Sequence, residues 1–225
     1  MPHSDSLSLA AAWFRLLTPE QQARVERDLS VQQVGAGAII ERKGELAQAW
    51  IGVLSGLIKV SVGNAEGKLA SLTGVPAGGW IGEGSLLKRE CRKYDVVALR
   101  DSVVARLPAP TFEWLLDSSI PFNRFLLDQL NERVAQFIGK AENDRLLDPD
   151  ARVARCLAEL FNPLLYPGMG MRLAITQEEV GYLGRVSRQR ANQALRTLEQ
   201  AGLLHIEYGA VRVLDLEGLK RYGVR

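Results

Sequence analysis

Residues 175–204 constrain the fold of this chain more than any other segment, because they hold two helix start signals separated by a short break. Thr176 and Glu179 have the spacing of a capping box, in which a hydroxyl and a carboxylate satisfy backbone donors at a helix start. After a break at residues 184–186, Ser187 is a favourable N-cap for a second helix. The pattern predicts two helices joined by a tight turn.

The second of these helices has an apolar face and a polar face. The apolar positions follow the i, i+3, i+4, i+7 spacing of a buried stripe and are Ala191, Ala194, Leu195 and Leu198. The opposite face carries long side chains that can donate to base edges, namely Arg188, Gln189, Asn192, Gln193 and Arg196. A merely solvated face is usually rich in Glu and Lys, but Glu199 is the only acidic residue between Ser187 and Gln200. The composition therefore favours a helix that reads DNA in the major groove.

Composition and charge are compatible with a globular DNA-binding protein. A chain of 225 residues with 47% hydrophobic and 24% charged residues can form one large or two modest domains with buried cores. The net charge of +2 is too small for a non-specific polycation. Residues 149–225, however, hold 11 Lys and Arg against 8 Asp and Glu, a mildly basic balance that suits a phosphate backbone.

Cysteine and histidine usage argues against a metal site. Cys91 and Cys156 lie far apart, and the two histidines are His3 and His205, so no ligand cluster is predicted. Cys156 falls in an apolar helical run and is expected in a core. We recognise no signal peptide, and the longest apolar run, residues 49–62, is too short to cross a bilayer. These features predict a protein of the reducing cytoplasm with no membrane partner.

The N-terminal half changes from helical to strand-like texture. Residues 9–29 are expected to be helical, with Thr18 and Pro19 as a start signal. Twelve of the 21 glycines then fall between residues 35 and 84. The short runs that alternate in hydropathy or flank turn residues are 58–62, 68–75, 96–99 and 103–107, with turns at 63–67 and 101–102. This texture predicts an antiparallel barrel or sandwich.

A long helix is predicted after Pro110. Its apolar residues step by 3, 4, 3 and 4, and we call this set the seam: Leu127, Leu130, Val134, Phe137 and Ala141. Two heptads are too few to establish a coiled coil unaided. The alternative is a helix packed on its own barrel, for which apolar surface is offered by Phe122, Phe125, Leu126 and Ile138. Both can hold, with one side of the helix on the barrel and the other on a second subunit.

The C-terminal part is predicted to start at a hinge. Residues 148–150, Asp-Pro-Asp, interrupt the long helix, and residues 151–161 form another helix. Residues 203–206 and 211–213, around Gly209, have the pattern of a two-stranded wing. We therefore expect a barrel domain at 1–118, a dimerisation helix and hinge at 119–147, and a DNA-binding domain at 148–225.

This order of elements resembles the Crp/Fnr superfamily of bacterial transcription regulators. Residues 175–204, ITQEEVGYLGRVSRQRANQALRTLEQAGLL, are similar to the family pattern ITRxEIGxxxGxSRExVxRxLxxLExxGLI. Residues 78–87, GGWIGEGSLL, are similar to the GxxxGExxLL opening of its phosphate-binding cassette. The resemblance implies an α+β protein with an N-terminal antiparallel jelly-roll barrel of the cyclic-nucleotide-binding type, a long dimerisation helix and a C-terminal winged helix-turn-helix.

The resemblance also implies how DNA is bound. A homodimer places two recognition helices one DNA turn apart on a palindromic double-stranded operator, and RNA polymerase is an expected further partner. The implied base-reading residues are Arg188, Gln189 and Gln193 with Asn192 and Arg196 nearby, and the implied phosphate contacts are Thr176 and Ser187. Many members have Glu at the position of Gln189 and Arg at that of Gln193, so a TGTGA-type half-site is not expected. Arg185 replaces a turn glycine, which predicts a different turn or a positive φ.

The cassette resemblance implies an effector site. Gly82 and Gly84 let the backbone approach a phosphate, and Glu83 matches the carboxylate that binds a ribose hydroxyl. Without gaps, Lys93 and Tyr94 align with the Arg-Ser pair of cyclic-AMP-binding members, and Lys lacks the bidentate fork of Arg. Asp95 would repel a phosphate, and the adenine-contacting hydroxyls are replaced by Phe137 and Ile138. We therefore expect a small-molecule effector other than cyclic AMP, with candidate binding residues Gly82, Glu83, Gly84, Ser85, Arg92, Lys93 and Tyr94.

Several alternatives stay open at this stage. The barrel could respond to cyclic AMP or cyclic GMP. It could instead bind no ligand, in which case Glu83 would only stabilise the cassette loop. It could also sense oxidation through Cys91, whose basic neighbours would favour the reactive thiolate. Two cysteines are too few for an iron–sulfur sensor, and neither histidine lies where a haem ligand is needed. A nucleotide-processing enzyme is disfavoured because no catalytic set of residues is recognisable. An architectural DNA-binding protein would show no sequence preference and a steep salt dependence.

Overall fold

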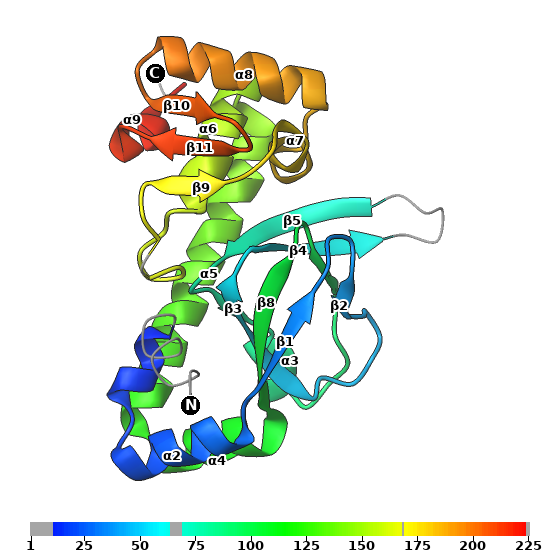
Figure 1. Cartoon of the computed structure of the whole chain (residues 1–225), viewed down its shortest axis with the longest axis vertical. Coiled ribbons are helices and arrows are strands. Elements are labelled where there is room, and N and C mark those ends of the chain that lie inside the picture. The colour runs from blue at the N-terminus through cyan, green and yellow to red at the C-terminus, as the bar shows by residue number, and fades with distance from the viewer. Residues whose placement is uncertain (1–10, 64–68, 168, 224–225) are drawn as a thin grey trace. The chain divides into compact units, whose positions relative to one another are not determined.

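The computed structural model describes residues 11–63, 69–167 and 169–223 of the 225. The chain forms two compact units, residues 1–131 with 164–168 and residues 132–163 with 169–225 (Figure 1). The division falls inside one long helix, between Asn131 and Glu132, and the domain limits expected from the sequence stay predictions. Among the described residues, no helix combines the length and the apolar character needed to cross a bilayer.

The N-terminal unit contains two antiparallel four-stranded sheets, ordered β1-β8-β3-β6 and β2-β7-β4-β5 (Figure 1). The strands are β1 (Ser30–Val34), β2 (Ile39–Glu41), β3 (Ala49–Ser55), β4 (Leu57–Gly63), β5 (Leu69–Pro76), β6 (Trp80–Ile81), β7 (Asp95–Ala98) and β8 (Ser102–Pro108). The predicted jelly-roll is confirmed, and β4, β5, β7 and β8 lie where alternation or flanking turn residues indicated strands, whereas β1, β2, β3 and β6 were not individually predicted. The predicted turn at 63–67 lies, apart from Gly63, outside the described residues.

An aromatic cluster forms the core of this unit. Trp50 and Trp80 have ring centroids 4.6 Å apart, and Trp13 lies 5.1 Å from Trp80. Phe112 and Phe122 complete the cluster, and both are fully buried. Aromatic pairs at these separations add to the burial of their area, so this cluster is a major contribution to the stability of the unit.

The helices of the N-terminal unit differ from the prediction at one place. They are η1 (Ala12–Leu16), α2 (Pro19–Asp28), α3 (Glu83–Leu87), α4 (Ala109–Ser118) and the first part of α5 (Ile120–Leu146). The prediction of one helix over residues 9–29 is wrong within the described residues, which form two separate helices, η1 and α2. Thr18 is extended, and its hydroxyl accepts from Gln21 N at 3.3 Å while Gln21 Oε1 accepts from Thr18 N at 3.0 Å. This capping box starts α2 anew, so the start signal at Thr18 is confirmed.

Helix α5 has an unusual distribution of polar and apolar residues. Four polar residues at helical spacing are buried: Gln129, Arg133, Gln136 and Lys140. Gln129 donates to the Trp80 carbonyl at 3.0 Å, and Lys140 Nζ donates to the Leu183 carbonyl at 3.2 Å. Four of the five seam residues are instead exposed, with Leu127 at 66%, and Leu130 is half-buried. The first part of α5 does pack on the core through Phe122 and Leu126, as predicted, whereas Ile138 is 64% exposed and does not.

The C-terminal unit contains a helix-turn-helix and a three-stranded sheet ordered β10-β11-β9. Its elements after α5 are α6 (Pro149–Glu159), β9 (Arg172–Ala174), α7 (Gln177–Gly184), α8 (Arg188–Gln200), β10 (Leu204–Glu207), β11 (Ala210–Val213) and α9 (Leu216–Arg221). Asp148 caps α6 by accepting from the backbone N–H groups of Asp150 and Ala151, which confirms the predicted break in the chain. The two-stranded wing is confirmed, and β9, a third strand of three residues, was not foreseen.

Candidate nucleic-acid interface

The predicted capping box at the start of α7 is formed. Thr176 Oγ1 accepts from Glu179 N at 3.2 Å, and Glu179 Oε2 accepts from Thr176 N at 2.5 Å. The cap uses the Thr176 oxygen only as an acceptor, so its hydroxyl proton remains a donor. Because the Thr176 side chain is exposed, that donor can reach a phosphate.

The turn between α7 and α8 depends on two backbone features. Arg185 has φ 55° and ψ 43°, the left-handed conformation that was one of the two predicted outcomes. Val186 N donates to the Gly181 carbonyl at 3.0 Å, and a Cβ on Gly181 would lie 2.9 Å from the Val186 carbonyl oxygen. Gly181 is thus needed for the close approach of the turn to α7, a role that was not predicted from the sequence.

Helix α8 buries one face and exposes the other, as predicted. Ala191, Ala194, Leu195 and Leu198 are at most 1% exposed. Ser187 Oγ accepts from Arg190 N at 3.1 Å and starts the helix. The buried stripe and the Ser187 cap hold the polar face of α8 in a fixed orientation.

The other prediction for a buried residue of this unit concerns Cys156. It lies on α6 and is buried as expected.

The candidate base-reading residues lie together on that polar face. Four are exposed and one, Asn192, is half-buried: Arg188, Gln189, Asn192, Gln193 and Arg196. The side chains of Arg188, Gln189 and Arg196 form no hydrogen bond or ion pair with the described residues. Asn192 Oδ1 accepts from Gln177 Nε2 at 3.0 Å, so α7 fixes the orientation of its amide. Gln177 is a further residue that the sequence reading missed.

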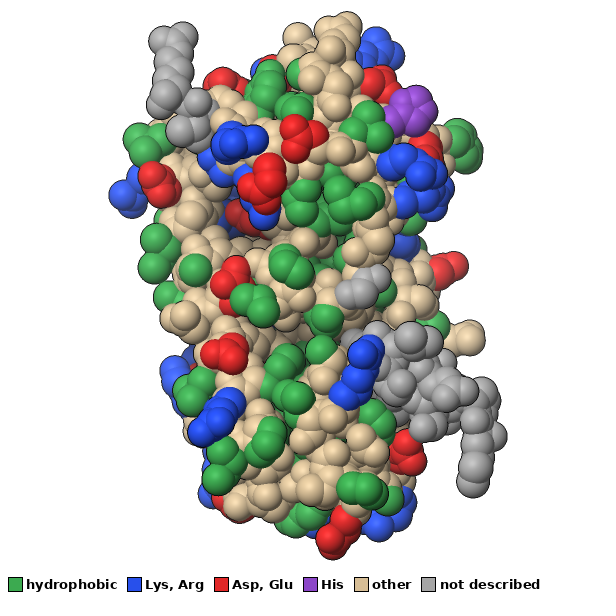
Figure 2. Space-filling model, turned by 90° about the vertical axis from the view of Figure 1, so that its left-hand side faces the viewer, with side chains coloured by type: hydrophobic (Ala, Val, Ile, Leu, Met, Phe, Trp, Pro, Cys, Tyr) green, Lys and Arg blue, Asp and Glu red, His purple; other side chains and the backbone are tan. Residues whose placement is uncertain are grey.

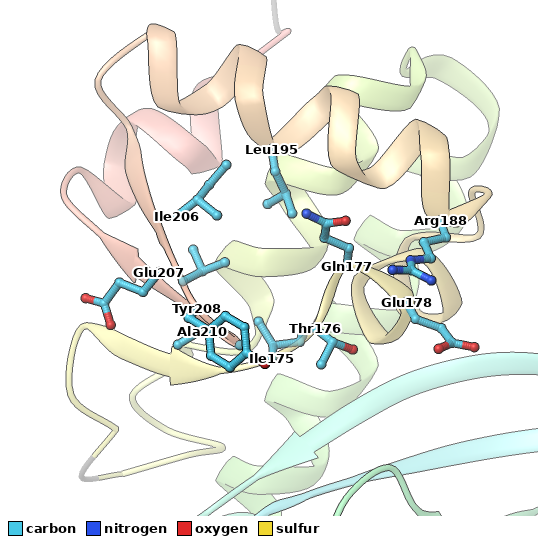
Figure 3. A pocket seen from close by; sticks show the side chains of 12 residues that line it. Ile175, Thr176, Gln177, Glu178, Arg188, Leu195, Ile206, Glu207, Tyr208 and Ala210 are labelled. Atoms are coloured by element: carbon cyan, nitrogen blue, oxygen red, sulfur yellow. The ribbon is translucent and has the colours of Figure 1, made fainter.

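A hollow of about 520 Å³ opens between the start of α7, helix α8 and the wing (Figure 3). Arg188 lines it from the first turn of α8, and Tyr208 lines it from the tip of the wing. Tyr208 is fully exposed and precedes Gly209, whose φ of +66° makes the turn of the hairpin. Helix α8 contributes Arg188 and Leu195 to the lining, so the hollow lies on the side of the buried stripe and reaches the polar face only at Arg188.

The charges around the hollow are partly balanced within the protein. Glu207 accepts from Arg172 Nε at 2.6 Å and from Arg212 Nε at 2.9 Å. These two hydrogen bonds, that from Arg172 first, lower the pKa of the Glu207 carboxyl below its ordinary value. Two cations against one anion leave this part of the wing positive. Arg190 differs, because it pairs with Asp150 at 2.8 Å.

Comparison with known proteins agrees with this geometry. Residues 31–119 match the family described as cyclic nucleotide-binding domain, and residues 151–222 match the Crp-like helix-turn-helix domain. The chain belongs to the Crp/Fnr superfamily. This is a superfamily of DNA-binding transcription regulators and not of enzymes.

Individual relatives extend the similarity over most of this Crp/Fnr protein. The cAMP-activated global transcriptional regulator CRP of Haemophilus influenzae is 25% identical over 214 residues, 87% of this chain and 95% of the relative. The transcriptional regulator SdrP of Thermus thermophilus is 29% identical over 171 residues, 75% of this chain and 80% of the relative. The structure of FixK2 from Bradyrhizobium japonicum has a TM-score of 0.73 at 14% identity, covering 88% and 98% of the chains, and supports the fold.

In the cassette (residues 78–95) of this Crp/Fnr protein, the arginine beside the glycine turn is Arg92. Its Nη1 donates to the Gly82 carbonyl at 2.7 Å, and Gly82 has φ +96°. A Cβ on Gly82 would collide with the guanidinium, so glycine is required there. Lys93, which the ungapped alignment placed at the family's arginine, is 67% exposed and pairs with Glu90 at 3.1 Å. The side chain that lies against Gly82 is therefore that of Arg92 and not that of Lys93.

The other candidate effector residues are mostly buried. Glu83 is 4% exposed, and its Oε2 accepts from Trp50 Nε1 at 3.3 Å. Ser85 is buried, whereas Gly84 and Tyr94 are half-buried. Asp95 accepts from Lys43 N at 2.8 Å. The assignment of these residues to an effector stays a prediction. Within the described part of the chain, no cluster of His, Cys, Asp or Glu could hold a metal ion.

Proposed function

We propose that this protein is a homodimeric, sequence-specific transcription regulator that reads a palindromic operator through α8. The observation that carries the proposal is the exposed polar face of α8, whose Arg188, Gln189 and Arg196 have no side-chain partner among the described residues. Side chains that can donate to base edges, and that nothing in the fold requires, are most simply explained by an external partner. We place the protein in the cytoplasm with its DNA, and RNA polymerase is its expected further partner.

The seam of α5 supports a homodimer. A helix in a monomer turns its apolar stripe inward, but here Leu127, Val134 and Phe137 are 66%, 55% and 40% exposed while polar residues are buried. Figure 2 shows that hydrophobic side chains reach the surface at many points, so exposure alone is not the argument. The argument is the heptad spacing of the seam, because two helices with this spacing can pack their apolar residues against each other as in a coiled coil.

A single charge in the seam tests the dimer. We expect Val134→Glu to dissociate it, because two carboxylates would face each other in an apolar contact. Light scattering coupled to size exclusion gives the mass directly. Ala135→Glu is the matched control, because Ala135 is exposed but lies outside the seam, and it should remain dimeric. A Val134→Glu variant that stays dimeric contradicts the proposal.

Operator binding is tested with Arg188→Ala. Loss of a bidentate base contact is expected to cost about 1–3 kcal/mol of operator affinity, with the fold unchanged. The measurement is fluorescence anisotropy with an operator selected from random duplexes. Arg27→Ala, on the exposed side of α2, is the control and should bind as the parent does. Unchanged affinity in Arg188→Ala excludes the assignment, and a parent protein without sequence preference but with steep salt dependence indicates an architectural role.

The signal received by the jelly-roll is proposed to be something other than cyclic AMP. Phe137 and Ile138 stand where the resemblance requires hydroxyl groups, and neither can hydrogen-bond a base. Response to a cyclic nucleotide is the second candidate, because the Haemophilus influenzae relative is named for activation by cyclic AMP. Titration of the dimer with cyclic AMP and cyclic GMP separates the two.

A further inference from the structure

All three guanidinium nitrogens of the cassette arginine, Arg92, have a partner within the protein. Arg92 Nε lies 3.1 Å from Glu41 Oε2, Nη1 donates to the Gly82 carbonyl at 2.7 Å, and Nη2 donates to the Ala49 carbonyl. Its side chain is 1% exposed. Each of the three guanidinium nitrogens therefore has an acceptor, and the acceptors come from β2, β3 and the residue before α3.

Glu41 is placed to neutralise this arginine. It is 6% exposed, and its second oxygen, Oε1, lies 2.5 Å from Arg106 Nη2. The register of β2 against β7 shifts between Ile39 and Glu41, and such irregularities redirect side chains. Arg106 is 27% exposed, so water screens the excess positive charge on that side. The carboxylate thus supplies the negative charge that buried Arg92 needs.

The carboxylate of the cassette is also engaged. Glu83 is buried, and one of its oxygens accepts from the Trp50 indole N–H in the aromatic core. The two charged groups that the cassette pattern offers to a nucleotide, the arginine and the glutamate, are therefore both held by the protein's own side chains. For a phosphate to take Arg92, the buried pair with Glu41 would have to separate, which is costly.

We propose that Glu41 is a built-in counter-ion that occupies the anion position on Arg92, so that the operator-binding state forms without a phosphate-bearing effector. The inference rests on the proposed function, because it concerns how that function is controlled. A tethered carboxylate cannot dissociate. The jelly-roll is then permanently in the state that an anionic ligand would otherwise produce.

The first arm of the test uses the full-length parent protein after exhaustive dialysis. Operator affinity and Tm are measured with cyclic AMP, cyclic GMP or inorganic phosphate at millimolar concentration. We expect operator binding without any ligand and no change on addition. Effectors typically change affinity by about 5- to 150-fold, so a change in that range with any of the three overturns the inference.

The second arm uses Glu41→Gln, which keeps the size of the side chain and removes its charge. Arg92 is then a buried cation without its counter-ion, and phosphate or a cyclic nucleotide should raise the Tm of this variant by about 2 °C or more. Glu90→Gln removes a half-buried carboxylate of the same cassette that pairs with Lys93, and it should show no such gain. A folded Glu41→Gln variant that ignores all three anions overturns the inference. If it does not fold, the parent titration alone decides.

The two proposals fail in different ways. If no duplex is preferred under any condition, sequence-specific regulation itself is excluded. If a duplex is preferred only after a cyclic nucleotide is added, operator reading stands and the built-in counter-ion is excluded.

Discussion

The cassette and helix α8 each contain an arginine within a family motif, and the two regions use that charge in opposite ways. Arg92 is 1% exposed and bonded to Glu41, Gly82 and Ala49. Arg188 is exposed and forms no hydrogen bond or ion pair with the described residues. Because a buried cation must be paired whereas an exposed one need not be, the first arginine belongs to the fold and the second can bind a partner. The role of each arginine is therefore indicated by the residues that it contacts within the protein and not by its position in a motif.

The largest expected effect is on the stability of the cassette. Arg92→Ala removes three contacts and leaves Glu41 buried with only Arg106, so we expect a loss of about 3 kcal/mol in the free energy of unfolding. Arg188→Ala should stay within about 0.5 kcal/mol of the parent. All four tryptophans, Trp13, Trp50, Trp80 and Trp114, lie in the N-terminal unit, so their fluorescence during urea unfolding monitors that unit. Equal stability of Arg92→Ala and the parent would remove the distinction between the two regions.

The two regions also differ in how far their structure could be predicted from the sequence, and the features of helix α8 were predictable. Helix starts are local, and the caps expected at Thr18, Thr176 and Ser187 are all formed by groups three residues away. The polar face of α8 follows from helical spacing alone. Both are fixed by neighbours in the chain, so a single sequence suffices to find them.

The environment of Arg92 was not predictable in the same way. Its partners Glu41, Ala49 and Gly82 are 51, 43 and 10 residues away in the chain, and an irregularity in β2 directs the first of them. The sequence reading weighed Lys93 because it compared positions without a gap. Packing in three dimensions instead places the preceding residue, Arg92, against Gly82. Strand β9 was missed for a similar reason, since its three residues are recognisable only by their pairing with β11.

A smaller effect tests how rigidly α8 presents its polar face. Gln177 Nε2 donates to Asn192 Oδ1 at 3.0 Å, so the amide of Asn192 is oriented before DNA arrives. Gln177→Ala should lower operator affinity by about 0.5–1.5 kcal/mol, the cost of ordering a side chain on binding. A double-mutant cycle with Asn192→Ala separates orientation from direct contact. Additive losses would show that Gln177 contacts DNA by itself, and a smaller combined loss would show that it acts through Asn192.

The smallest expected effect lies at the wing, which combines the two uses of charge. Glu207 accepts hydrogen bonds from Arg172 and Arg212, and both lower the pKa of its carboxyl below the ordinary value. Glu207→Gln removes one negative charge beside the hollow and frees two cations. If the wing approaches the phosphate backbone, the slope of log affinity against log salt should become steeper by about 1. Glu217→Gln, on α9 and paired with Lys220, removes the same charge away from the hollow and should leave the slope unchanged. An unchanged slope in Glu207→Gln as well would place Arg172 and Arg212 with Arg92, as arginines that serve the fold.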